Sequence, residues 1–427
     1  MFRLVFAYNT FMKNIVKKVL IVGSSAKEYA LAKKIISYGN CNVFVAPGNN
    51  SISEIANCID IREDSCKELL EFALENAIDI TIASSEKAIR ADIASIFQAN
   101  DQQIFAPSAK SAEITLYRSS AKKFLYKSRI STPHFGVYDK LQSAIDYLKN
   151  APMPQVIHAD SPFEYGDRLV CTTFSSAKTF VEDLFAKGEQ KIVLEDYVFG
   201  HEFTLYIISD GYHAIPLTSV ANYKFMENGN GGILTTGIGA FTPDYKISKE
   251  IENTLMKLVV NNILGNLQKK GTPYLGILGI DCVLKEDGKF IVLNFKPFLS
   301  DHDAQAVLSI TEENILELFK ACAIGSFADD YNIIKISDNA SVSCVISSRA
   351  KGKTISGLEF ADSEITPFSL TKNKYLEYET IEGKNIALTN TASTLSRARK
   401  HLYEDINMIK FDGIKYRTDI CEQVEKF

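Results

Sequence analysis

From residue 18 the chain alternates between short apolar runs that end in turns and segments whose apolar residues recur at helical spacing. The apolar runs are expected to be four strands, at residues 18–25, 41–50, 78–86 and 102–108. Helices between consecutive strands predict an open, mainly parallel sheet with helices on both faces. Ligands bind at the carboxyl ends of strands in such sheets. The candidate site positions are therefore the turns after Val22, Ala46, Ala83 and Ala106.

The remainder of the chain, after a helical stretch, changes to shorter strands joined by longer polar connections. Two hairpins are predicted, one turned at Asp210-Gly211 and one at Asp287-Gly288, because Asp-Gly is a favoured hairpin turn. One long helix is expected over residues 247–270. The sequence is therefore that of an α/β protein whose second half is built largely from hairpins.

Composition and charge argue against several classes of protein. There are 47 Lys and Arg against 52 Asp and Glu, so the net charge is −5 and no nucleic-acid partner is expected. The eight cysteines lack any C-x-x-C pair, which indicates reduced thiols in a cytoplasmic protein. No apolar run approaches the roughly 20 residues of a membrane span, so no membrane partner is expected. Residues 1–17 are interpreted as an N-terminal extension, with Met12 a candidate start.

Six segments match a known pattern in the same order along the chain. They are KVLIVG with KEYAL, VFVAPGN, ITIASSE, IFAPS, SSR at 347–349 and KFDGIKYRTDI. Together they resemble the phosphoribosylamine–glycine ligase family of the ATP-grasp superfamily, and the resemblance runs from Lys18 to about Ile420. The last two segments are the most diagnostic, because they resemble this ligase and not its carboxylase-type relatives.

The resemblance implies an architecture and a reaction. The domains would be an N-terminal extension, a Rossmann-like (pre-ATP-grasp) substrate domain, an ATP-grasp lid, an ATP-grasp core and a small α+β domain, at 1–17, 18–118, 119–192, 193–330 and 331–427. The reaction would join glycine to 5-phosphoribosylamine in purine biosynthesis, with ATP cleaved to ADP and phosphate and Mg²⁺ as a cofactor. The protein would be a monomer or a homodimer.

The nucleotide-binding residues implied by the resemblance are Lys122, His158, Glu195, Tyr197, Val198 and Glu202. His158 stands where the family has a lysine that contacts the phosphates. In the loop that follows, Ser161 replaces a glycine and Asp167 brings a negative charge toward the phosphates. Arg168 is a candidate substitute cation.

The implied metal ligands are Asn294 and Asp301. The family has Glu-Phe-Asn where this chain has Asn294-Phe295-Lys296, and the i, i+2 spacing keeps both outer side chains on one face of a strand. Lys296 cannot bind Mg²⁺ while protonated, since an ammonium has no lone pair. It can instead occupy the volume and charge of one metal ion. Asp281 is a candidate replacement ligand.

The implied substrate and catalytic residues come from turns and loops. The substrate residues are Gly23, Pro47, Gly48, Asn49, Glu86, Lys224 and Gly239, and the catalytic residues are Thr235, Gly237 and Arg349. In the loop 228–241, Leu234 and Thr236 replace an asparagine and a glycine of the family pattern.

The 23 glycines in 427 residues, about 5%, fall below the usual share of roughly 7%. In the matched segments they are missing where backbone must approach phosphate or ligand. Three functions therefore stay open: an active ligase, a catalytically impaired relative that binds a nucleotide or phosphoribosyl ligand, and an ATP-grasp ligase with another substrate. Turnover assays distinguish the first two, and an amino-acid screen distinguishes the third.

Overall fold

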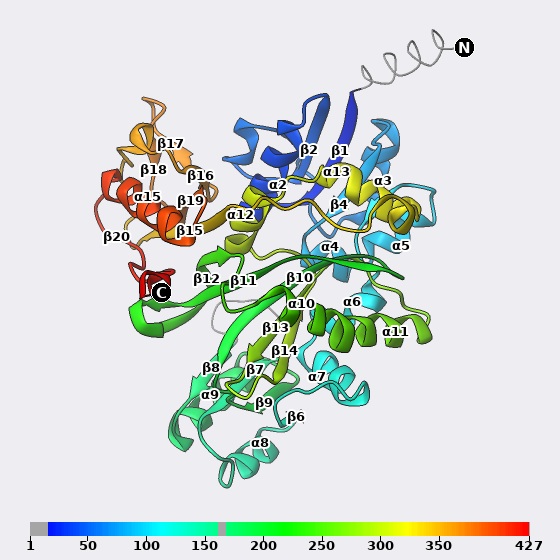
Figure 1. Ribbon diagram of the computed structural model, residues 1–427, viewed down its shortest axis with the longest axis vertical. Coiled ribbons are helices and arrows are strands. Elements are labelled where there is room, and N and C mark those ends of the chain that lie inside the picture. Colours follow the sequence, from blue (N-terminus) through cyan, green and yellow to red (C-terminus); the bar gives the residue numbers. More distant parts are fainter. Residues whose placement is uncertain (1–15, 161–167, 427) are drawn as a thin grey trace.

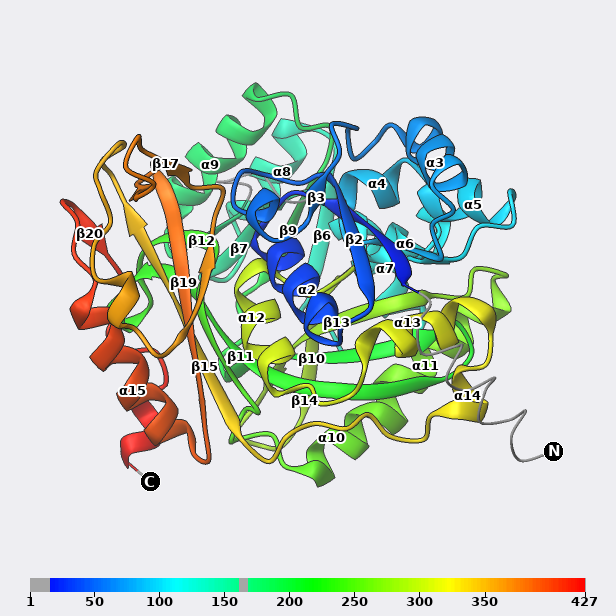
Figure 2. The same cartoon turned by 90° about the horizontal axis from the view of Figure 1, so that it is seen from above.

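The computed structural model describes residues 16–160 and 168–426. Its N-terminal part is a parallel sheet in the order β3-β2-β1-β4-β5 (Figures 1 and 2), which confirms the predicted open sheet. The strands are β1 (Lys17–Gly23), β2 (Cys41–Pro47), β3 (Asn57–Cys58), β4 (Ile80–Ala83) and β5 (Ile104–Phe105). The helices between them are α2 (Ala26–Ser37), α3 (Cys66–Glu75), α4 (Glu86–Arg90) and α5 (Ile93–Gln98), with the short turn η1 (Ile52–Glu54).

The central strand β1 is buried on both faces, as its unbroken apolar run requires. Val19 and Ile21 pack in one cluster with α2, whereas Leu20 and Val22 pack in another with α3 and α5. Alternate side chains of a strand point to opposite faces, so helices cover both sides of the sheet.

A second, antiparallel sheet in the order β6-β9-β7-β8 forms the lower lobe in Figure 1. Its strands are β6 (Phe135–Tyr138), β7 (Gln155–Ala159), β8 (Arg168–Cys171) and β9 (Ile192–Asp196). Two helices, α8 (Leu141–Leu148) and α9 (Phe174–Ala186), pack on it through buried aliphatic residues. The helices α6 (Ala109–Leu116) and α7 (Arg118–Lys127) precede this lobe.

The largest sheet runs β14-β13-β10-β11-β12-β15-β19-β16, with β20 paired to β15. Its strands are β10 (His201–Asp210), β11 (Ala214–Glu227), β12 (Gly231–Thr242), β13 (Leu275–Leu284), β14 (Phe290–Lys296), β15 (Ala340–Ser348), β16 (Glu364–Pro367), β19 (Gly383–Ala392) and β20 (Ile414–Lys415). Both predicted Asp-Gly hairpins are confirmed, because β10 pairs with β11 and β13 with β14. The C-terminal strands join the core through the pairing of β12 with β15, so one sheet crosses both parts.

The helices of the second half include α12 (Asp301–Ile310), which contacts both the N-terminal part and the large sheet. They are α10 (Lys249–Leu255), α11 (Asn261–Lys269), α12 (Asp301–Ile310), α13 (Ile315–Ile324), α14 (Phe327–Asp330) and α15 (Leu395–Met408). The predicted helix 247–270 consists of α10 and α11 joined by a π-helical turn, η3 (Met256–Val260). Helix α12 contacts α2 of the parallel sheet as well as β12 and β15 of the large sheet. The minor elements are η2 (Asn228–Asn230), η4 (Leu358–Phe360), η5 (Glu422–Lys426), β17 (Thr371–Lys372) and β18 (Tyr378–Glu379).

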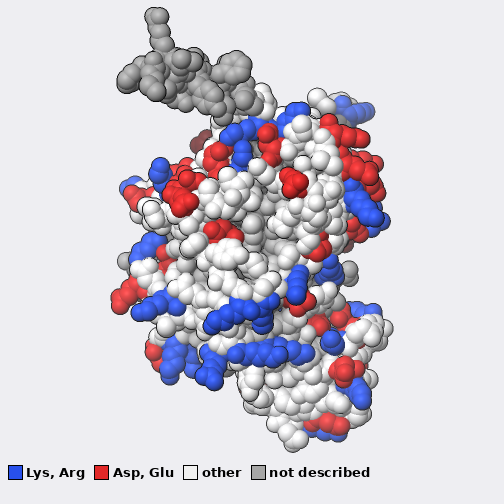
Figure 3. All heavy atoms as spheres, turned by 90° about the vertical axis from the view of Figure 1, so that its right-hand side faces the viewer, with Lys and Arg blue, Asp and Glu red and all other residues white. Residues whose placement is uncertain are grey.

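The charged residues on the surface and the state of the cysteines can be compared with what the composition predicts. Figure 3 shows Lys and Arg interspersed with Asp and Glu over one face of the molecule. All eight cysteines are free thiols. In the described part of the chain, no helix is long and apolar enough to span a membrane.

The aromatic pair Phe105 and Phe319 joins the parallel sheet to α13. The two rings stack with centroids 4.0 Å apart and an interplanar angle of 9°, and both side chains are buried. We expect F319A to lower the free energy of unfolding by about 3–5 kcal/mol, because it leaves a cavity between the two parts. The measurement is urea denaturation followed by circular dichroism. F360A, at a 66% exposed phenylalanine, is the control and is expected to change stability by less than about 0.5 kcal/mol. Equal stability losses would contradict the packing role.

Candidate functional site

A cavity of about 440 Å³ opens where the parallel sheet, the lobe formed by β6 to β9 (the lid lobe) and the large sheet meet. Its walls come from the ends of β1 and β4, the starts of α2, α4, α7, β8 and α12, and the strands β11 to β14. Six basic residues line it: Lys27, Lys87, Arg118, Arg168, Lys224 and Lys296. The acidic lining residues are Glu28, Glu63, Glu86, Asp281 and Asp301. Such a lining suits a ligand that carries several negative charges together with hydrogen-bond donors.

The structure brings only some of the sequence-predicted residues to this cavity. Those that line it are Gly23, Glu86, Lys224, Thr235, Asn294 and Asp301. Those that do not are Pro47, Gly48, Asn49, Lys122, His158, Glu195, Tyr197, Val198, Glu202, Gly237, Gly239 and Arg349. Arg349, predicted to be a catalytic residue, lies exposed just after β15. The predicted residues therefore form two groups, those that line the cavity and those that lie outside its lining.

Serine hydroxyls lie at the ends of β1 and β4. Ser24 and Ser85 donate to the two carboxylate oxygens of Glu63, at 2.7 and 2.6 Å. Ser84 donates to buried Glu28, at 2.5 Å. These bonds link the turn after β1, the turn after β4 and the segment before α3. The local shortage of glycine is thus matched by a serine and carboxylate network on the cavity wall.

The predicted phosphate turn after β2 supports the turn after β1. The Gly48 amide donates to the Gly23 carbonyl at 3.2 Å, and the Asn49 side chain donates to the Ser24 carbonyl at 2.8 Å. Gly48 has φ +67°, and a β-carbon there would lie 2.3 Å from Cys58 Sγ. The segment Pro47–Asn49 therefore shapes the wall instead of lining the cavity.

Three predicted nucleotide residues form a sealed cluster with one another. Lys122 pairs with Glu195 and also donates to Thr132 Oγ1 at 3.2 Å, while His158 Nε2 lies 2.6 Å from Glu195 Oε1. The exposed fractions of Lys122, His158 and Glu195 are 0%, 3% and 4%. The polar atoms of these residues therefore contact one another, and their roles in nucleotide binding stay predictions.

Burial and neighbouring charges set the protonation of this cluster. Burial, reinforced by Arg118, lowers the pKa of His158 to about 3, so its ring is neutral and donates one hydrogen bond. Burial alone would raise the pKa of Glu195, but Lys122 and His158 outweigh it and hold that pKa low. Burial lowers the pKa of Lys122, partly offset by Glu195.

Two other nucleotide-site predictions lie beside this cluster. The Tyr197 amide donates to the Pro154 carbonyl at 3.2 Å, and its ring packs against Phe199, so the segment of Tyr197 and Val198 faces the lid lobe. The loop carrying Ser161 and Asp167 lies outside the described residues.

The neutral buried His158 makes a pH prediction. The unfolded chain protonates this histidine below about pH 6.5 while the folded protein does not, so stability falls as the pH drops through that range. We expect H158Q to flatten the dependence of unfolding free energy on pH by about 1.4 kcal/mol per unit near pH 5. Denaturation curves at several pH values measure this slope. H401Q, at an exposed histidine, is the control for a histidine-to-glutamine change at the surface. An unchanged slope in H158Q would contradict the neutral state.

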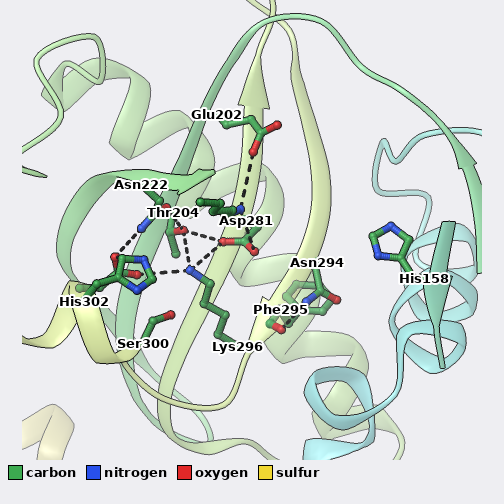
Figure 4. Close-up of polar contacts among 12 residues, drawn as sticks. His158, Glu202, Thr204, Asn222, Asp281, Asn294, Phe295, Lys296, Ser300 and His302 are labelled. Atoms are coloured by element: carbon green, nitrogen blue, oxygen red, sulfur yellow. Dashed lines mark hydrogen bonds and ion pairs between the residues drawn. The ribbon is translucent and has the colours of Figure 1, made fainter. Parts of the chain in front are cut away.

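The large sheet carries a second buried charge network, centred on Lys296 (Figure 4). The ammonium lies 3.2 Å from Asp281 Oδ1 and 3.3 Å from Asp303 Oδ2, and donates to Thr204 Oγ1 at 3.1 Å. Asp303 also accepts from Tyr206 and Asn222. Figure 4 places His158 well apart from this network, on another strand.

The charges of this network support one another. Burial alone would lower the pKa of Lys296, but Asp281, Tyr206 and Asp303 outweigh it and raise that pKa well above its ordinary value. Burial alone would raise the pKa of Asp281, but Lys224 and Lys296 hold it low. Lys224 also lies 3.6 Å from Glu202 Oε2, so the predicted nucleotide-binding residue Glu202 is paired to a basic residue of the cavity.

The residues at the implied magnesium position do not fit a metal ion. The Asn294 amide donates to the Phe295 carbonyl at 2.8 Å, and Asp301 accepts from Ser25 Oγ and the Lys27 amide. Across residues 16–160 and 168–426, no cluster of three His, Cys, Asp or Glu is arranged to hold a metal. Mg²⁺ requires several oxygen ligands at roughly 2.1 Å, and Lys296 occupies the space between the available carboxylates.

The loop between β11 and β12 is held by contacts of its own. Thr235 Oγ1 donates to the Lys224 carbonyl at 2.7 Å and accepts from the Gly237 amide at 2.9 Å. Gly237 has φ +118°, and a β-carbon there would lie 1.9 Å from the buried ring of His302. The predicted catalytic residues Thr235 and Gly237 therefore set the loop conformation above His302. Gly239 is constrained similarly by the side chain of Ile420.

G237A tests this close approach. We expect it to destabilise the protein by about 1–3 kcal/mol, because the methyl group collides with His302 and the backbone is left-handed. G383A is the control, since Gly383 has φ +97° with open space around it and reports the backbone cost alone. Urea denaturation of G237A, G383A and the double variant G237A/H302A separates the cost of the steric contact from the cost of the backbone conformation. If H302A recovers none of the stability that G237A loses, the predicted contact between the methyl group and His302 is contradicted.

Several cavity residues were missed by sequence reasoning. Arg118 begins α7 and reaches the cavity, although only Lys122 of that helix was predicted. Lys27 lies in the KEYAL segment, so its position was visible in the sequence but its role was not assigned. Lys384, from the C-terminal part, donates to Thr236 Oγ1 at 2.7 Å and no local sequence signal indicates this contact.

Comparison with known proteins finds two family models that match this chain. The family model described as phosphoribosylglycinamide synthetase, N domain, matches residues 17–115, and the model described as its ATP-grasp (A) domain matches 117–304. The phosphoribosylamine–glycine ligase of Clostridium acetobutylicum is 28% identical, over 94% of this chain and 99% of its own length. That of Halalkalibacterium halodurans is 29% identical, over 94% and 96%.

Solved structures agree with the fold. The crystal structure of phosphoribosylamine–glycine ligase from Thermotoga maritima superposes with a TM-score of 0.80 at 21% identity, covering 94% of this chain and all of that one. The biotin carboxylase domain of the Hydrogenobacter thermophilus 2-oxoglutarate carboxylase, solved with MgADP and bicarbonate, gives a TM-score of 0.72 at 14% identity. It covers 94% of this chain and 91% of that one.

Proposed function

We propose that this chain, which belongs to the phosphoribosylglycinamide synthetase family, is an ATP-dependent ligase that joins glycine to 5-phosphoribosylamine in purine biosynthesis. The observation that carries the proposal is the position of the cavity. All of its lining residues fall within the two matched domains, the end of the parallel sheet on one side and the ATP-grasp part on the other. The substrates of such a reaction must meet at this junction.

The charges of the cavity suit the proposed substrates. ATP and the sugar phosphate are polyanions, and charge-assisted hydrogen bonds from Arg and Lys are the strongest common contacts to phosphate. Arg118 begins α7 and Arg168 begins β8, whereas Lys27 and Lys87 come from α2 and α4 beside the parallel sheet, so bound phosphates are proposed to lie between these two pairs. Glu86, at the start of α4, supplies an acceptor for an amine.

The reaction has two proposed steps. The glycine carboxylate attacks the γ-phosphate, which forms an acyl phosphate and releases ADP. The amine nitrogen of phosphoribosylamine then attacks the acyl carbon, phosphate leaves, and the nitrogen loses a proton. ATP-grasp enzymes use ATP with Mg²⁺, but the carboxylates near Lys296 do not fit a metal ion. The contribution of this chain is therefore assigned to positioning and to its fixed cations.

The proposal is tested by ADP release in a coupled assay with phosphoribosylamine, glycine and MgATP, each omitted in turn. We expect ADP only when all three are present, and R118M to lower kcat/KM for ATP roughly ten- to hundredfold, because a charged hydrogen bond contributes about 1.5–3 kcal/mol. R397M, at an exposed arginine of α15, is the control. Tight ATP binding without ADP release would support the catalytically impaired alternative, and turnover with another amino acid would support a ligase of different substrate.

The compartment, the partners, the domain boundaries and the oligomeric state of this protein are also proposals. We propose a cytoplasmic protein whose partners are small molecules. The division into an extension, a substrate domain, a lid, a core and a C-terminal domain at 1–17, 18–118, 119–192, 193–330 and 331–427 is also kept as a proposal. Size-exclusion chromatography with light scattering distinguishes a monomer from a homodimer.

A further inference from the structure

The Lys296 side chain ends at the point toward which three elements direct oxygen atoms. Thr204 comes from β10, Asp281 from β13 and Asp303 from α12, and each has an oxygen atom between 3.1 and 3.3 Å from the ammonium nitrogen. The side chain itself comes from β14 (Figure 4). An ammonium has three N–H groups, so these three partners use its full donor capacity.

The cations of this cluster come from the chain itself. Lys296 pairs with both Asp281 and Asp303, and Lys224 lies 3.9 Å from Asp281 and 3.6 Å from Glu202. The side chains of Lys296 and Asp281 are 13% and 10% exposed, and that of Asp303 is fully buried. Unpaired carboxylates at such burial would be strongly destabilising, so some cation must occupy this position.

We propose that Lys296 is a built-in cation that takes the place of a divalent metal ion between Asp281 and Asp303, so these carboxylates bind no metal of their own. The ammonium supplies a single positive charge that is covalently attached and present at any metal concentration. The cost of burying the two carboxylates is thereby met by the chain itself. The inference concerns protein ligands only, and does not extend to ions carried by a nucleotide.

The proposal also predicts what the site becomes without the lysine. K296N would replace the ammonium by an amide oxygen on the same face of β14 as Asn294, because the two positions are related by i, i+2. That oxygen, together with Asp281 and Asp303, supplies three oxygen ligands of the kind that Mg²⁺ and Mn²⁺ prefer. The single substitution is thus expected to create a divalent-cation site.

The experiment measures Mn²⁺ binding by electron paramagnetic resonance and by isothermal titration calorimetry, without nucleotide. We expect no Mn²⁺ bound to the wild type in the cavity and at least about tenfold tighter Mn²⁺ binding to K296N, the scale on which metal ligands act. K296R keeps the positive charge and should resemble the wild type. K285N, at an exposed lysine on the turn between β13 and β14, is the matched surface control and should gain nothing.

Two results would overturn the proposal. One is Mn²⁺ bound to the wild type and lost in D281N; the other is a folded K296N that gains no affinity. If K296N unfolds in EDTA, refolding with Mn²⁺ supports the proposal. If it refolds in neither condition, the wild-type measurement decides alone. This inference does not rest on the ligase activity, because it is read from metal binding, so its failure and the failure of the ADP-release assay are distinguishable.

Discussion

The buried ion pairs of Lys296 hold together the strands that form one wall of the cavity. Lys296, Asp281 and Thr204 lie on three adjacent strands, and Asp303 belongs to α12, which also contacts the parallel sheet. Two residues before Asp303, Asp301 accepts from Ser25 and Lys27 across the cavity. Because a buried charge is stable only when its partners are complete, the alignment of β13, β14 and α12 depends on this cluster, and the Asp301 contacts connect α12 to the N-terminal sheet.

The same principle explains the lid and the strand ends of the parallel sheet. Lys122, Glu195 and His158 satisfy one another inside the lid, and Glu28 and Glu63 are satisfied by serine hydroxyls at the ends of β1 and β4. At those strand ends glycine would leave backbone N–H groups accessible to a phosphate, whereas serine adds a donor that binds a carboxylate. Charges that are mutually paired contribute to the rigidity of the walls more than to ligand binding.

The sequence predicted what depends on local pattern. Apolar periodicity gave the parallel sheet, Asp-Gly gave both hairpins, and the i, i+2 spacing indicated that Lys296 can occupy a metal position. It did not predict the cluster of Lys122, His158 and Glu195, because the three residues lie on different elements and their contacts depend on side-chain rotamers. Arg118 was missed for the same reason, since nothing in its neighbours shows that the start of α7 faces the cavity.

A fixed ammonium and a metal ion differ in charge and in available coordination, and this difference shifts the electrostatics of the cavity. Lys296 carries one positive charge and directs its three N–H groups to protein oxygens, so it has no donor left for a ligand. A bound polyanion must then be stabilised by basic residues on the other walls. These include Arg118, at the start of α7, and Arg168, at the start of β8, whose guanidinium groups can each bind phosphate through two hydrogen bonds. If Lys296 holds the core carboxylates, the placement of α7 and β8 beside the core becomes the geometric requirement for binding phosphate.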